Sequence, residues 1–154
     1  MIVNAFNNNI ETGLRILCIL NQNYPKTFDL QTLLYLDYFA VHSGDISDIK
    51  SLHAPVPYRT GELLVKRSLI KDAIELFCIR NLISVSYTPS GLEYFASELS
   101  SPFIESLQEE YTIELIKRIN WLTDNINLEK ENLQSLFESK IESVNREFNL
   151  GILE

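Results

Sequence analysis

The sequence predicts an α+β fold that is mostly α, with three helices, then a β-hairpin, then a C-terminal helical hairpin. Apolar residues recur at helical spacing in five segments, and one stretch over 82–96 reads as two short strands joined by a turn. Acidic residues are concentrated in the last third of the chain. With 154 residues, 45% of them hydrophobic, the chain is long enough to bury a core of its own.

Capping residues and a proline set the expected bounds of the first two helices. The first is expected from Thr12, whose hydroxyl can cap it, to about Asn23, and Pro25 stops it. Asp29 is a good N-cap for the second helix, which is expected to run through about His42.

A carboxylate lies within the apolar pattern of the second helix. Asp37 falls among Leu33, Leu34 and Tyr38, and an unpaired charge is costly to bury. We therefore expect a cationic partner for it, and Arg15 and Arg59 are the candidates.

A third helix and a β-hairpin are predicted after the first two helices. The helix is expected from Thr60 or Gly61 to about residue 80, followed by a strand over 82–87, a turn over 88–91 and a second strand over 92–96. Three helices followed by a β-hairpin wing is the order of a winged helix. We therefore assign residues 1–97 to a winged-helix-like domain.

Residues 98–154 form an acidic extension. Ser101 caps and Pro102 opens a predicted helix that keeps one apolar stripe as far as Ile126, and a last helix is expected over about 129–148. These helices can pair as a hairpin and pack on the first domain or on a partner. The extension carries a net charge of −7, against −1 for residues 1–97.

Composition excludes several classes of protein. The net charge of −8 argues against nucleic-acid binding over the whole surface. Cys18 and Cys78 are too few and too far apart for a disulfide framework or a zinc site. No apolar run is long enough to span a membrane, and the first residues lack the pattern of a signal peptide, so we expect a cytoplasmic protein.

Polar residues gather between the second and third helices. Ser43, His53 and Asp45 could form a nucleophile, base and orienter, but no strained turn presents the serine. His42, Asp45 and His53 could ligate a metal, but no recognised metal-binding motif is present. We expect these side chains to hold a long loop instead, and we predict no catalytic residue, cofactor or metal site.

Basic residues are concentrated on the third helix. This face could be a solvated surface, a contact for an acidic partner protein, or a contact for DNA phosphates, as in winged helices. The candidate partner-contact residues are Arg59, Glu62, Lys66, Arg67 and Lys71.

Several short strings together resemble a known family. They are Asn4-Ala-Phe-Asn, Glu11-Thr-Gly-Leu-Arg15, Leu36-Asp-Tyr-Phe-Ala-Val-His-Ser-Gly-Asp45, Ser51-Leu-His-Ala-Pro, Pro57-Tyr-Arg-Thr-Gly-Glu-Leu-Leu-Val-Lys-Arg67, Gly91-Leu-Glu-Tyr-Phe-Ala96 and Ser101-Pro-Phe103, with Tyr111 and Trp121. In this order, over residues 4–122, they resemble the middle component (type 2) of ABC-three-component systems. Within these strings we expect a structural polar motif made of Glu11, Arg15, Asp37, His42, Ser43, Asp45 and His53.

The resemblance implies a non-enzymatic subunit of a Lamassu-like anti-phage complex. Its partners would be a coiled-coil ABC ATPase similar to SMC and Rad50 proteins, and an effector that is often a nuclease. DNA would be met indirectly, through the complex. The alternative is a stand-alone winged-helix transcriptional regulator, which would bind duplex DNA with strong salt dependence.

Overall fold

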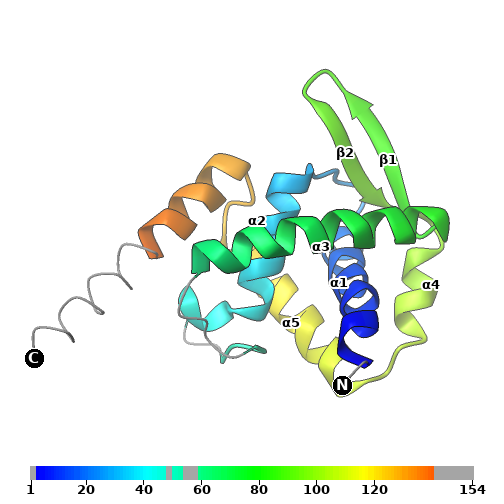
Figure 1. Cartoon of the computed structure of the whole chain (residues 1–154), viewed down its shortest axis with the longest axis horizontal. Helices are drawn as coiled ribbons and strands as arrows, with labels where there is room; N and C mark the ends of the chain where they lie inside the picture. Colours follow the sequence, from blue (N-terminus) through cyan, green and yellow to red (C-terminus); the bar gives the residue numbers. More distant parts are fainter. Residues whose placement is uncertain (1–2, 48–49, 54–58, 141–154) are drawn as a thin grey trace, which may run out of the picture.

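The computed structural model describes residues 3–47, 50–53 and 59–140, with side chains within 9–47, 50–53 and 61–140. It confirms the predicted class, mostly helical α+β with a winged-helix-like arrangement (Figure 1). The elements are α1 (Val3–Gln22), α2 (Leu30–Val41), a short 3-10 helix η1 (Ser43–Asp45), α3 (Arg59–Ile79), β1 (Ile83–Thr88), β2 (Gly91–Ala96), α4 (Ser100–Glu105) and α5 (Glu110–Asn125). Residues 130–140 are helical as well.

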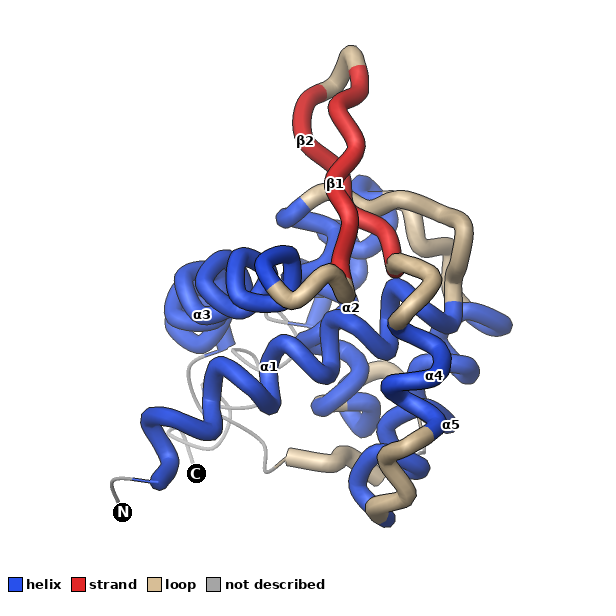
Figure 2. The backbone as a smooth tube through the Cα atoms, turned by 90° about the vertical axis from the view of Figure 1, so that its right-hand side faces the viewer, coloured by secondary structure: helices blue, strands red, loops and turns tan. Residues whose placement is uncertain are grey.

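Helix α1 is the central element of the helical body. It contacts α3, α2, α4, α5 and β2, and Figure 2 shows it between α3 on one side and α4 and α5 on the other. Residues 16–20 are fully buried, as the apolar pattern around this helix requires. The helix begins earlier than predicted: Thr12 is buried within it, and its hydroxyl accepts a hydrogen bond from Arg15 instead of capping a first turn.

Helix α2 is confirmed at both ends. The Asp29 side chain accepts a hydrogen bond from the Thr32 backbone N–H at 2.8 Å, which satisfies one of the free donors of the first turn. Every residue from Thr32 to Val41 is buried, Asp37 included. A helix buried on all sides is apolar around its whole circumference, and this one depends on its neighbours to satisfy its single charge.

Helix α3 ends in a Schellman motif that leads into the wing. Asn81 adopts a positive φ of 61°, and the Leu82 N–H bonds to the Phe77 carbonyl at 3.0 Å. Strands β1 and β2 then pair from Ile83 with Ala96 to Thr88 with Gly91, and the hairpin projects away from the helices (Figures 1 and 2). Gly91 supplies the positive φ of 125° that the turn requires.

The single long helix predicted after Pro102 is wrong. The chain forms α4, leaves helical geometry over 106–109, and resumes as α5. The Ser106 hydroxyl donates to the Phe103 carbonyl at 2.6 Å, and the Leu107 N–H closes a tight turn on Ile104. The interruption lets α4 pack on α1 while α5 packs on both α1 and α2.

The helix over 130–140 packs on α2 through aromatic rings. Phe137 lies 5.0 Å from the ring centre of Tyr38 and 5.7 Å from that of Tyr35. Leu133 is fully buried beside it. Residues 141–148 of the predicted last helix lie outside the described part of the chain, and the domain division after residue 97 stays a prediction.

Candidate functional site

The buried carboxylate of α2 has the cationic partner expected for it, and a second one. Arg15 Nε donates to Asp37 Oδ1 at 2.7 Å, and Lys66 Nζ donates to Asp37 Oδ2 at 2.9 Å. Arg15 belongs to α1 and Lys66 to α3, so one carboxylate joins the three helices of the winged-helix-like domain. The side chain of Arg59, the other candidate, lies outside those described.

Electrostatics favour the charged form of this cluster. Burial alone would raise the pKa of Asp37, but the charges of Arg15 and Lys66 outweigh it and lower the pKa to about 2. The pKa of Arg15 is raised, because the Asp37 carboxylate outweighs the opposing effect of burial. Asp37 is therefore ionised at neutral pH, and the cluster holds two cations against one anion.

A second set of contacts ties α2 to the start of α3. His42 Nε2 lies 3.1 Å from Glu62 Oε1, and the Tyr38 hydroxyl donates to Asp45 at 2.7 Å. Burial would raise the pKa of Glu62, but the hydrogen bond and charge of His42 lower it. The first contact links the end of α2 to the start of α3, and the second links α2 to η1.

The 43–53 segment is held to the rest of the protein from the other side. His53 Nε2 hydrogen-bonds with the Tyr111 hydroxyl at 3.0 Å, and Arg118 donates twice to the Lys50 carbonyl, at 2.7 and 3.0 Å. Ser43 Oγ donates to the same carbonyl at 3.2 Å. Burial and the charges of Arg15 and Lys66 lower the pKa of His53, which favours a neutral ring at neutral pH.

Each residue of the predicted polar motif makes a polar contact, but the seven residues fall into several separate sets. Glu11 links Arg15 to His53, since its carboxylate lies 3.6 Å from the first and 3.8 Å from the second. Ser43, Asp45 and His53 each bond to a different group, which is the geometry of a loop held in place. Within the described residues, no three His, Cys, Asp or Glu side chains form a group that could hold a metal ion.

The predicted partner-contact residues are divided between two sides of α3. Arg67 and Lys71 are exposed, and Arg67 donates to Gln31 at 2.8 Å. Lys66 is only 7% exposed, because its ammonium group is bound to Asp37 in the interior. Glu62 is partly buried beside His42. The structure thus places Lys66 within the polar core, while the contact role of the set stays a prediction.

The exposed side of α3, which we call the α3 outer face, carries apolar residues that sequence reasoning missed. Leu64 is 67% exposed and Val65 is 63% exposed, and Ile79 lies exposed at the other end of the helix. The remaining exposed residues of this face are Arg67, Ser68, Lys71, Asp72 and Glu75. The available signal was that Leu64 and Val65 fall outside the stripe of Leu63, Ile70, Ala73, Ile74 and Phe77.

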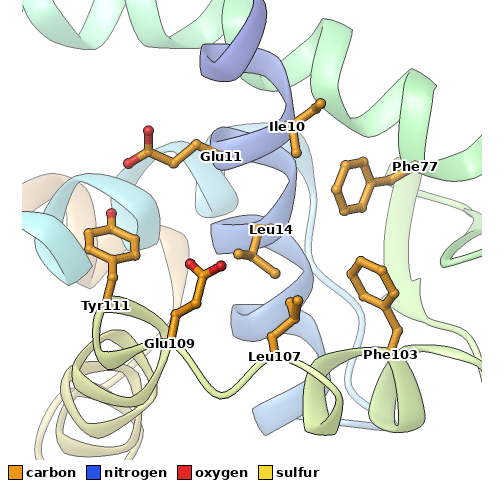
Figure 3. A pocket seen from close by; sticks show the side chains of 8 residues that line it. All are labelled: Ile10, Glu11, Leu14, Phe77, Phe103, Leu107, Glu109 and Tyr111. Carbon is orange, nitrogen blue, oxygen red and sulfur yellow. The ribbon is translucent and has the colours of Figure 1, made fainter. Parts of the chain in front are cut away.

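A groove with a volume of about 490 Å³ lies between α1, the end of α3, α4 and the 106–109 interruption. It is lined by Ile10, Glu11, Leu14, Phe77, Phe103, Leu107, Glu109 and Tyr111, and we call it the α1–α4 groove. Figure 3 shows the two carboxylates and the tyrosine on one side and the two phenylalanine rings on the other. Sequence reasoning did not find this groove, because it predicted a continuous helix where the chain is interrupted.

One comparison with known proteins identifies a family for this chain. A family model described as ABC-three component (ABC-3C) system Middle Component 2 matches residues 5–147. No curated protein and no solved structure matches the chain significantly. Among the described residues, no helix combines the length and the apolar content that crossing a bilayer needs.

Proposed function

The chain belongs to the Middle Component 2 family of ABC-three component systems, and from this membership we propose that it is a non-enzymatic bridging subunit of a Lamassu-like anti-phage complex. It links an SMC/Rad50-like coiled-coil ABC ATPase to an effector, often a nuclease. By holding both, it restrains the effector until the ATPase encounters aberrant DNA. DNA contact belongs to the assembled complex, and the subunit acts in the cytoplasm.

The observation that carries this proposal is the chemistry of the α3 outer face. In a winged helix this helix enters the DNA major groove, where affinity depends on an excess of Lys and Arg. Among the described residues, the exposed face carries Arg67 and Lys71 against Asp72 and Glu75, and Leu64 and Val65 are exposed beside them. A neutral face with exposed apolar residues is typical of a protein contact.

The wing supports the same conclusion. Residues 83–96 contain no lysine or arginine, so the hairpin offers no cation to a phosphate backbone. The most exposed of its large hydrophobic side chains is Tyr87. A stand-alone DNA-binding regulator, the alternative, would have no cation on its wing and no excess of cations among the described exposed residues of α3.

Co-purification with the ATPase and the effector tests the proposal. Leu64→Asp with Val65→Asp should release one of the two other subunits, because both side chains are exposed and the change adds two charges to a contact surface. Leu99→Asp is the matched control, since Leu99 is also exposed but lies before α4. Complex formation that is unaffected by the double variant would refute the use of this face.

The basic residues of this face can be tested separately. Arg67→Glu with Lys71→Glu should weaken the same complex and leave the fold intact. Lys66 must be left unchanged, because reversing a charge that pairs with buried Asp37 would unfold the protein. A gel shift on the purified subunit tests the alternative function: tight, salt-dependent duplex binding without partners would favour a regulator.

A further inference from the structure

The α1–α4 groove is open, apolar at its base and acidic along one side. Ile10 is 50% exposed and Phe103 is 37% exposed at its margins, while Phe77 is buried beneath them. The carboxylates of Glu11 and Glu109 lie on the opposite side from the phenylalanine rings (Figure 3). The groove therefore presents two chemically different walls along its length.

We infer that this groove binds an amphipathic helix of another subunit, with apolar side chains against Phe77 and Phe103 and lysine or arginine side chains against Glu11 and Glu109. The inference rests on the proposed bridging function and gives it a second contact, separate from the α3 outer face. A helix fits because it presents an apolar stripe with charged residues along its flank, which is how amphipathic helices bind grooves. The volume of about 490 Å³ is sufficient for several anchoring side chains.

Charge decides between possible occupants. Both charged side chains that line the groove are acidic, and Glu105 and Glu110 are exposed nearby on the neighbouring turns. Residues 141–154 of this chain contain three glutamates and one arginine, and a second copy of the chain has a net charge of −8. Like charges disfavour both of these occupants, whereas a basic segment of a different protein is complementary.

Burial shows why the groove is not needed for folding. Ile10, Phe103 and Leu107 remain partly or largely exposed although Leu14 and Phe77 nearby are well packed. The α4–α5 interruption leaves this apolar surface uncovered, and a continuous helix would not bring Leu107 and Glu109 to the same edge. Uncovered apolar surface of this kind is found at interaction sites.

A synthetic peptide tests the groove on the isolated full-length protein. The probe is an amphipathic helical peptide with leucines on one face and lysines on both flanks, and the comparison peptide has glutamates in place of the lysines. Fluorescence anisotropy should show the lysine peptide binding at least about tenfold more tightly than the glutamate peptide. Equal affinity for the two peptides would overturn the inference.

Variants then locate the binding. Phe103→Ser and Glu109→Arg should each weaken the lysine peptide by about tenfold. The matched controls are Tyr87→Ser, an exposed aromatic residue on the wing, and Glu129→Arg, an exposed glutamate after α5. Binding that falls equally in the control variants would show that it does not depend on the groove, and this would overturn the inference.

Co-purification separates this inference from the proposed function. Phe103→Ser with Glu109→Arg should release one of the two other subunits while the α3 outer-face variant releases the other. If the groove variant keeps both subunits and the outer-face variant loses one, the groove inference fails and the bridging function stands. If the wild-type subunit binds neither protein, the bridging function fails, and peptide binding still decides whether the groove takes a basic helix.

Discussion

The inner and outer faces of α3 reverse the usual distribution of residue types. On the inner face Lys66 is buried and bound to Asp37, while on the outer face Leu64 and Val65 are largely exposed to solvent. A helix selected only for the stability of this chain would place a charged residue outside and two aliphatic residues inside. The inner face therefore serves the fold, and the exposed aliphatic residues are available to a partner.

This difference shows where changes should affect stability and where they should affect assembly. Removing one group of the inner cluster takes a charged partner away from buried groups that water reaches poorly. Residues of the outer face contribute little to folding, because their side chains remain in water in the isolated protein. The following predictions run from the largest expected effect on stability to the smallest.

Asp37→Ala should destabilise the protein by about 3–5 kcal/mol, because it removes the buried carboxylate to which both Arg15 and Lys66 are bound. Urea denaturation followed by circular dichroism measures the change. Asp72→Ala, on the exposed side of α3, is the control and should cost less than about 0.5 kcal/mol. Equal losses in the two variants would remove the distinction between the faces.

Gly13→Ala should cost about 3 kcal/mol, at the upper end of the range for overpacked cores. A Cβ atom at this position would overlap the Phe77 ring, where α1 and α3 pack closely. Thermal denaturation measures the loss. In a Phe77→Leu background the same change should cost clearly less, and an unchanged cost would show that the ring is not the obstacle.

Acid should weaken the inner cluster selectively. The folded-state pKa of Asp37 is about 2, below its ordinary value of 3.8, so its contribution is present above about pH 4 and is lost as the pH falls towards 2. The stability difference between the wild type and Asp37→Asn should shrink by about 2 kcal/mol over this range. Denaturation curves at several pH values test it, and a difference independent of pH would contradict the assignment.

Leu64→Ser with Val65→Ser should change the free energy of unfolding by less than about 0.5 kcal/mol, because both side chains are already in water. The same double variant should lose co-purification with a partner subunit. The free energy of unfolding and the co-purification should be measured on the same preparation of the variant. A large loss of stability would mean that these residues belong to the core.

Much of the fold could be predicted from local signals. The Asp29 cap, the hairpin over 83–96 and the order of the first three helices all follow from short-range chemistry, and the structure confirms them. The Arg15–Asp37 pair could be anticipated because a carboxylate in an apolar stripe demands a cation. The start of α1 and the interruption after α4 could not be predicted from the sequence, because both depend on packing against distant elements.

The sequence by itself determined the element order, the acidic C-terminal part and the need for a cationic partner at Asp37, since caps, periodicity and charge are properties of neighbouring residues. Only the tertiary structure decided that Lys66 pairs with buried Asp37. Helical spacing places Leu64 and Val65 outside the apolar stripe of α3, but it cannot identify a carboxylate twenty-nine residues away in the chain as the partner of Lys66. The α1–α4 groove arises in the same way, from four separate segments that meet only when the chain is folded.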